Sequence, residues 1–217
     1  MRSPASVEKS PATNSAPFVF VGEKLWLDFV NSDDATHSRG EARSDALVSF
    51  DRFVAWLSAA RLLDDERATA MLRRAQQQPT GSSAALHEAR RLRNVLRALA
   101  ERGDAPQERA TQTAIGEINR ILGRSAGTRR VEPRSDGGFV RNFVTAGDVF
   151  AGLMIPIIES AADGLVSSEL QRVRKCADPR CARVFFDGSR NGKRRWCDMK
   201  TCGNRAKAAR HRKKLSG

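Results

Sequence analysis

The sequence lacks the features that mark membrane proteins, secreted proteins and the commonest nucleotide-dependent enzymes. Its 217 residues contain no apolar run approaching the roughly 20 residues that span a bilayer, and the N-terminus has no apolar signal segment. It has no P-loop, no dinucleotide-binding fingerprint and no G-x-S-x-G elbow. Only two histidines, His37 and His87, precede the cysteine-containing tail. We therefore expect a soluble, cytoplasmic protein that is not an enzyme.

Cysteine is also scarce, and all four cysteines lie in the last 46 residues. Cys176 and Cys181 form one C-x4-C pair, Cys197 and Cys202 form another, and 15 residues separate the pairs. Two such pairs can supply the four thiolates of a tetrahedral zinc site. Two disulfides would need an oxidising compartment, and four unrelated buried thiols would not explain the equal spacings. The pattern therefore predicts one structural zinc ion held by all four cysteines.

Negative charge is nearly absent from the same tail. Residues 172–217 hold 16 Lys and Arg against Asp178, Asp187 and Asp198, a net charge of +13, whereas residues 1–171 hold 22 of each sign. Four thiolates on one zinc dication would lower the net charge of the tail to about +11. Such a surface suits a phosphate backbone, because cationic side chains release the counterions condensed on nucleic acid.

The residues around the cysteines predict how the tail folds. Asp178-Pro179 indicates a turn between the first two cysteines, and Asn191-Gly192 readily takes the positive φ of a hairpin tip. Asp198 is a candidate N-cap for a helix that runs to about Lys214. This order is that of a treble clef, with its turn, strand, hairpin tip, returning strand and helix at Cys176–Cys181, Ala182–Asp187, Gly188–Lys193, Arg194–Trp196 and Asp198–Lys214.

The fingertip and the helix supply the candidate nucleic-acid contacts. The helix has no broad apolar stripe, which favours an exposed basic surface over packing in a core. Asn204 and Arg205 lie within a turn of Cys202, so they either read base edges or brace the clef. Phe185, Phe186 and Trp196 are expected to form a small core against the helix. The candidate contacts are Arg190, Lys193, Arg194, Asn204, Arg205, Lys207, Arg210, His211 and Lys214.

Two motifs resemble known families. Residues Cys176–Arg205, with Arg195-Trp196-Cys197 and the closing Cys202-Gly203-Asn204-Arg205, closely resemble the CGNR zinc finger of bacterial proteins. Leu27-Asp28-Phe29-Val30-Asn31, followed by Ser32 where the family has threonine, is similar to the N-terminal signature of ABATE-type domains. The resemblance implies a zinc-binding treble clef at the C-terminus of a stress-induced transcription regulator.

The body preceding the tail has mostly helical periodicity. We expect a disordered arm over residues 1–17, a mainly helical α+β domain over 18–163 and the zinc finger over 164–217, with the boundary at Asp163-Gly164. Two short strands and a helix containing Pro156 complete this domain. The expected elements are a strand at 18–21, helices at 25–30, from Ser49, at 64–78, 82–102 and 106–122, strands at 128–132 and 138–145, and a helix at 148–162.

The sequence leaves two hypotheses for the function of the body. Trp26, Asp28, Asn31 and Trp56, with His37 nearby, mix polar and aromatic character as the pocket for a small-molecule effector would, but buried core aromatics and satisfied backbone groups explain the same residues. The body could instead form a homodimer on paired half-sites. Together these features predict a nucleoid-associated, DNA-binding bacterial regulator; an RNA-binding or protein-interaction module is the alternative. A nuclease is disfavoured, because no general base lies near the metal.

Overall fold

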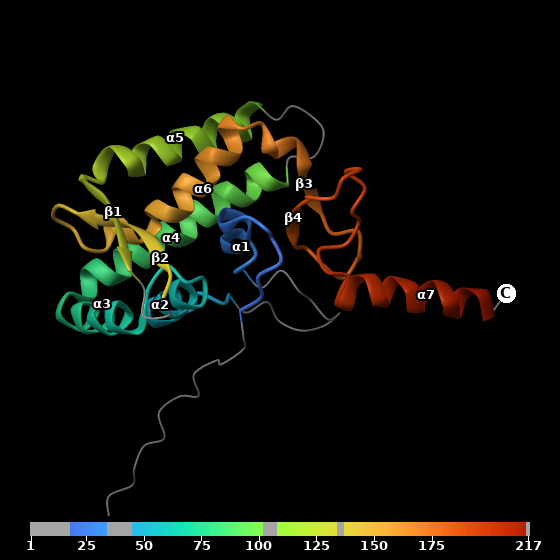
Figure 1. Cartoon of the computed structure of the whole chain (residues 1–217), viewed down its shortest axis with the longest axis horizontal. Helices are drawn as coiled ribbons and strands as arrows, with labels where there is room; N and C mark the ends of the chain where they lie inside the picture. The colour runs from blue at the N-terminus through green and yellow to red at the C-terminus, as the bar shows by residue number, and fades with distance from the viewer. Residues whose placement is uncertain (1–17, 34–44, 102–107, 134–136, 216–217) are drawn as a thin grey trace, which may run out of the picture.

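The computed structural model describes residues 18–33, 45–101, 108–133 and 137–215, and it is mostly helical with two small antiparallel sheets (Figure 1). The predicted disordered arm and His37 lie outside these residues. In chain order the elements are α1 Leu25–Val30, α2 Phe50–Ala59, α3 Asp65–Gln77, α4 Pro79–Ala100, α5 Glu108–Arg124, β1 Gly127–Pro133, β2 Phe139–Thr145, the 3-10 helix η1 Ala151–Met154, α6 Ile155–Val166, the 3-10 helix η2 Glu169–Arg172, β3 Val173–Lys175, β4 Val184–Phe186, the π-helical turn η3 Met199–Gly203, and α7 Asn204–Leu215.

The helices begin where side chains satisfy their first backbone donors. The Ser49 hydroxyl accepts from the Arg52 amide at 3.2 Å at the start of α2, and Asp64 accepts from the Arg67 amide at 2.8 Å at the start of α3. Pro79 and Pro156 lie in the first turns of α4 and α6, where a missing N–H costs nothing. Pro156 therefore lies in the first turn of α6 and does not break the helix.

The core of the body lies between α1, α2, α4 and α6. Trp26, Phe29 and Trp56 are each at most 1% exposed, and the Phe29 and Trp56 rings meet edge to face at 5.2 Å. Gly164 lets α6 approach α1, because a Cβ there would lie 3.3 Å from the Trp26 indole nitrogen. The short helix α1 is thus the centre of the body, covered by longer helices.

The hairpin of β1 and β2 lies at the opposite end of the molecule from α7 (Figure 1). Its strands pair antiparallel from Gly127 opposite Thr145 to Pro133 opposite Phe139. Phe139 is 75% exposed near the tip, while Phe143 is half-buried near η1. The two-strand prediction is confirmed, with bounds shifted by one residue.

Three sequence predictions differ from the structure. Residues 18–21 form no strand, because their extended backbone pairs with no neighbouring strand among the described residues. Arg194–Trp196 does not return as the partner of Val184–Phe186; that partner is β3. Helix α6 passes through Asp163 and Gly164, the predicted boundary, and ends at Val166.

Within the described residues, no helix combines the length and the apolar character that crossing a bilayer requires.

Asp28 organises the segment that leads into α1. Its carboxylate accepts from the Gly22 amide at 2.7 Å, which folds this segment back onto the helix. Gly22 must lack a side chain, since a Cβ there would lie 2.7 Å from both the Asp28 nitrogen and the Leu27 Cβ. Burial raises the pKa of Asp28 to about 6, with the hydrogen bond from Gly22 offsetting part of that shift.

The raised pKa predicts how Asp28→Asn changes stability with pH. A folded-state pKa above the unfolded value gives stability that is present below about pH 4 and lost as pH rises through about 6. Asparagine keeps the acceptor oxygen without the charge. At pH 8 we expect the free energy of unfolding of Asp28→Asn, measured by denaturant titration, to exceed that of the wild type by about 1–3 kcal/mol. Near pH 4 this difference should vanish. An equal difference at both pH values would contradict the assignment.

Candidate metal centre

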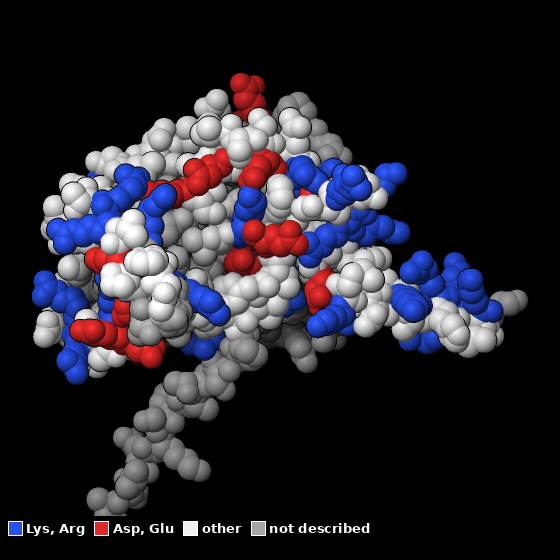
Figure 2. All heavy atoms as spheres, in the orientation of Figure 1, with Lys and Arg blue, Asp and Glu red and all other residues white. Residues whose placement is uncertain are grey.

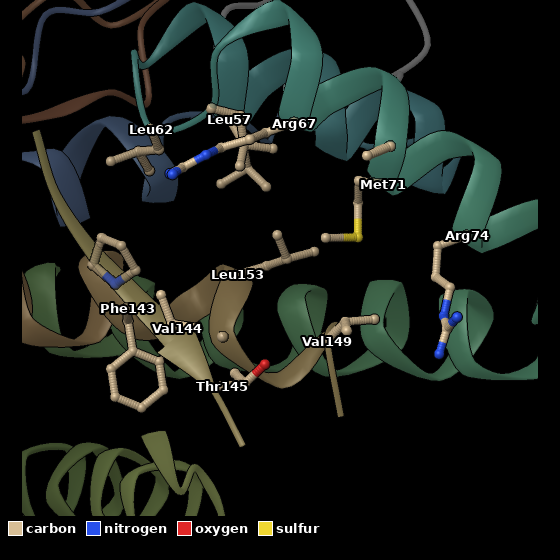
Figure 3. A pocket seen from close by; sticks show the side chains of 14 residues that line it. Leu57, Leu62, Arg67, Met71, Arg74, Phe143, Val144, Thr145, Val149 and Leu153 are labelled. Carbon is tan, nitrogen blue, oxygen red and sulfur yellow. The ribbon is translucent and has the colours of Figure 1, made fainter. Parts of the chain in front are cut away.

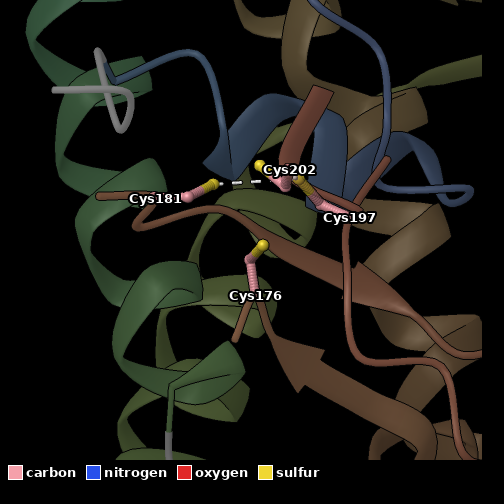
Figure 4. A group of neighbouring side chains, drawn as sticks. All are labelled: Cys176, Cys181, Cys197 and Cys202. Carbon is pink, nitrogen blue, oxygen red and sulfur yellow. Dashed lines mark hydrogen bonds between the residues drawn. The ribbon is translucent and has the colours of Figure 1, made fainter. Parts of the chain in front are cut away.

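The four cysteines converge on one point (Figure 4). Their Sγ atoms all lie within 4.8 Å of one another, and the residues are 0–6% exposed. Cys197 Sγ lies 3.7 Å from both Cys181 Sγ and Cys202 Sγ, and all four thiols are free. Disulfide sulfurs would be about 2.05 Å apart. Sulfurs bound to one tetrahedral zinc at about 2.3 Å would be about 3.8 Å apart. The cluster therefore fits metal binding and contradicts the disulfide alternative.

The electrostatics of the cluster favour a bound cation. Hydrogen bonds from the Cys181 and Cys197 thiols lower the pKa of Cys176, because they stabilise its thiolate. The hydrogen bond to that first thiolate raises the pKa of Cys181 to about 12, and the same neighbours raise the pKa of Cys197. Four thiolates at this spacing thus require a positive ion between them, and zinc is the ion that this donor set suits.

Two aspartates shape the turns that carry the cysteines. In the first turn, the Asp178 carboxylate accepts from the Arg180 amide at 3.0 Å, and its carbonyl accepts from the Cys181 amide at 2.9 Å. Asp198 caps η3 by accepting from the Lys200 and Thr201 amides at 3.2 and 3.0 Å. The predicted turn and the predicted N-cap are therefore both present, and each places a cysteine pair in the cluster.

Arg205 links the two turns. Its Nε donates to Asp178 Oδ2 at 2.7 Å, and its Nη2 donates to Cys202 Sγ at 3.0 Å. A cation hydrogen-bonded to a ligand sulfur offsets the negative charge of a four-thiolate site and orients the ligand. Of the two roles that the sequence left open for Arg205, the structure displays the bracing one.

The aromatic residues divide between two cores. Phe185 is fully buried against the cysteines, with Trp196 packed at the edge of the same cluster. Phe186 instead packs against the core of the body, and the Lys24 ammonium lies 4.7 Å from the centre of its ring. The predicted small core is thus formed by two of the three aromatic residues.

Strand β4 joins the tail to the body through alternate residues. On one edge, the Arg183 carbonyl accepts from Cys176 at 2.9 Å and the Asp187 amide donates to Arg172 at 2.8 Å, flanking the pairing with β3. On the other edge, Asn31 donates to the Val184 carbonyl at 2.8 Å and accepts from the Val184 amide at 3.0 Å. The edge expected to receive Arg194–Trp196 is therefore occupied by the body.

Further contacts extend this junction. The Phe186 amide donates to the Gly22 carbonyl at 2.9 Å, and Val184 is fully buried in the core of the body. Arg97 of α4 donates to the Ala182 carbonyl at 3.2 Å and to the Val30 carbonyl at 2.9 Å. The tail is therefore packed against the body and is not attached to it by a linker alone.

The two parts of the chain match two family models. The model of the ABATE family, described as "putative stress-induced transcription regulator", matches residues 23–168, and that of the CGNR zinc finger matches residues 172–214. The chain belongs to the ABATE family. A search of curated proteins gave no match. The match to the CGNR zinc finger begins at residue 172, where η2 ends, eight residues beyond the start predicted from the sequence.

The residues proposed as an effector pocket have other roles in the ABATE domain. Trp26 and Trp56 are core aromatics, Asp28 holds Gly22, and Asn31 holds Val184 of the CGNR zinc finger. The recorded hydrogen bonds of the Asp28 and Asn31 side chains are all made with backbone groups. Of the two explanations that the sequence left open for these residues, packing and backbone satisfaction accounts for the contacts in the structure.

The nine candidate nucleic-acid residues of the CGNR zinc finger separate into two groups. Arg194 pairs with Glu23 and donates to the Trp196 carbonyl at 2.9 Å, and Asn204 donates to the Lys200 carbonyl at 3.0 Å. With Arg205, these make internal contacts. The other six are exposed and form no recorded ion pair with any described residue: Arg190, Lys193, Lys207, Arg210, His211 and Lys214.

Sequence analysis missed the residues of the ABATE domain that hold the CGNR zinc finger. Arg97 looked like one more polar residue of a helix, and Gly22 had no visible role. For Asn31 the sequence offered a ligand pocket or the satisfaction of buried backbone groups, but it did not indicate which backbone groups. The only available signal was the position of Asn31 and Gly22 on either side of α1, where both can reach one strand.

Replacing one ligand should release the metal and unfold the CGNR zinc finger alone. We expect Cys197→Ser to reduce the zinc content, measured by mass spectrometry, from one ion per chain to well below one, and to expose residues 172–215 to hydrogen exchange while α4 stays protected. Met199→Leu, which removes an exposed sulfur beside the cluster, should keep its zinc. Full zinc content in Cys197→Ser would contradict the assignment of ligands.

Asn31→Ala should loosen the junction without emptying the metal site. It leaves the Val184 amide and carbonyl without their partners, at a cost of about 2–4 kcal/mol, so the Val184 amide should exchange with solvent much faster. The zinc content should not change, because Asn31 touches no cysteine pair. Asn94→Ala, on the exposed face of α4, is the control. Unchanged protection of Val184 would show that packing alone holds the junction.

Proposed function

We propose that this protein is a bacterial, nucleoid-associated DNA-binding transcription regulator, in which a treble clef around one structural zinc ion contacts DNA. The observation that carries the proposal is α7. Six of its twelve residues are Lys or Arg, none is acidic and none is buried. A helix that is polar all round gains nothing from the core, and a polyanionic partner would give its cations a role.

The placement of α7 supports contact with a duplex. It extends away from the rest of the molecule, and Figure 2 shows basic side chains along it, among uncharged ones, and no acidic side chain. Twelve helical residues span about 18 Å, and a major groove about 12 Å wide admits one helix. Ala206, Ala208 and Ala209 keep the helix narrow between its cations. It could therefore approach base edges and phosphates together.

The acidic residues of the tail weaken this surface little, because two of them are buried and the third is used as a helix cap. Asp178 and Asp187 are 4% and 0% exposed, and Asp198 caps η3. Burial raises the pKa of Asp187, but hydrogen bonds from Ser189 and Arg194 outweigh it and hold the pKa below its usual range. Its charge is therefore retained inside the finger, and the outward surface is left to the cations.

In this proposal zinc is structural and not catalytic. Four thiolates fill a tetrahedral shell and leave no open position for a substrate. The ion fixes η3, and hence the start of α7, relative to the turn at Asp178 and to β4. The ABATE domain senses a small-molecule effector or forms a homodimer, and it sets the orientation of α7 through the junction at Asn31.

The proposal predicts an enriched motif when the zinc-loaded chain selects from random duplex DNA at about 150 mM salt, where non-specific attraction is weak. Arg210→Ala should weaken binding to all duplexes alike and reduce the slope of log affinity against log salt by about 0.9. Arg73→Ala, exposed on α3 of the body, should leave the slope unchanged.

Two outcomes would favour the alternative functions. Binding that is tighter to single-stranded or hairpin RNA, with no enriched duplex motif, would indicate an RNA-binding module, since both polymers present the same phosphates. Loss of all nucleic-acid binding at 150 mM salt would leave a protein-interaction module with an acidic partner as the explanation of α7.

A further inference from the structure

The body contains a pocket that neither the DNA-binding proposal nor the family descriptions assign. It lies between α3 and the segment from β2 to α6, with a volume of about 550 Å³ (Figure 3). This volume falls within the range of small-molecule sites, about 300–1,000 Å³. Most of its lining is apolar, including Leu57, Leu62, Met71, Phe143, Val149 and Leu153. It is at the end of the molecule away from α7.

One face of α3 gives the pocket its polarity. Arg67, Met71 and Arg74 follow one another at positions i, i+4 and i+7, so they project from the same side of the helix. Figure 3 shows Met71 between the two arginines, with its thioether directed toward Leu153. None of the fourteen lining residues is acidic. A ligand would therefore meet an apolar middle with a cation near each end.

The two arginines are not equivalent. Arg67 pairs with Glu132 of β1, and its Nε also lies 3.6 Å from Asp64 Oδ2. Arg74 forms no recorded ion pair or hydrogen bond with any described residue. Arg67 is thus neutralised by the protein, whereas Arg74 retains an unpaired guanidinium beside an apolar surface. The Arg74 side chain lines the pocket and is exposed, so it could pair with one anionic group of a ligand.

We propose that this pocket binds an apolar monocarboxylate, an alkyl or aryl acid, whose carboxylate pairs with Arg74 and whose hydrocarbon part packs against Met71, Val149 and Leu153. A guanidinium binds a carboxylate through two parallel hydrogen bonds. A doubly charged phosphate would need more donors than one unpaired arginine offers. The apolar lining excludes water from the hydrocarbon part of the ligand and supplies most of the affinity.

The test is calorimetric titration of the zinc-loaded full chain with decanoate and, separately, with 2-naphthoate, each below its aggregation range. We expect dissociation constants on the order of 10–100 μM for at least one of them. Decylamine, which has the same chain and the opposite charge, should bind at least tenfold more weakly than decanoate. The titration contains no nucleic acid, so its result is independent of whether the zinc finger binds DNA.

Matched variants locate the site. Arg74→Gln should weaken binding of the carboxylate tenfold to a hundredfold, because it removes a charged hydrogen-bond donor. Arg73→Gln makes the same change at an exposed neighbour outside the pocket and should change binding by less than twofold. Ala70→Phe, which fills the pocket from α3, should weaken binding of decanoate and of neutral decanol alike.

Three results would overturn the proposal. Absence of binding by both acids at 1 mM would show that the pocket does not take this class of ligand. Equal affinity of decanoate for the wild type and Arg74→Gln would remove the role of the guanidinium. Equal loss in Arg73→Gln and Arg74→Gln would indicate attraction to the general charge of α3 and not a site.

Discussion

The position of the zinc finger depends on the hydrogen bonds along the two edges of one short strand. Strand β4 has three residues, and the chain on one side of it belongs to the finger while the chain on the other side belongs to the body. Asn31 acts there as a third strand would, because its amide group offers one donor and one acceptor to Val184. A buried strand edge without such a partner would be unstable. The last residue of the Leu27–Asn31 motif therefore acts in the junction between the body and the finger.

The metal cluster performs a different task from that junction. The core around Phe185 and Trp196 is too small to hold some forty residues in one conformation, and a metal bound by the four cysteines would supply the missing stability. Arg205 and Asp178 connect the two ligand turns directly, and Asp198 places the second turn at the start of η3. Two of the acidic side chains that would reduce the positive surface of the tail, Asp178 and Asp187, are buried inside it. Folding of the finger and the exposure of its cations are therefore linked.

What the sequence could predict depended on the range of the interaction. The cap at Asp198 acts within three residues, and the spacing of the cysteines is set by the geometry of a metal site, so the predicted cap and the predicted convergence of the four cysteines are confirmed. The partner of β4 could not be chosen locally. Arg194–Trp196 follows a good hairpin tip, with Gly192 at a φ of +62°, yet β3 and the body occupy both edges of the strand. Asn31 and Val184 are 153 residues apart, a separation that no local pattern reveals.

Because the finger is packed against the body, the pocket at one end of the molecule and α7 at the other end can influence each other. A finger on a flexible linker would not respond to a ligand bound by the body, because its contacts would be the same in the free and the ligand-bound protein. Here α6 lines the pocket at Pro156 and packs on α1 at Gly164, and α1 ends at the asparagine that holds β4. A change in the packing of α6 on α1 therefore acts on the strand from which the finger is built. Coupling requires in addition that the ligand binds two arrangements of these helices with different affinity. A change of arrangement would then reach the finger through the hydrogen bonds between Asn31 and Val184.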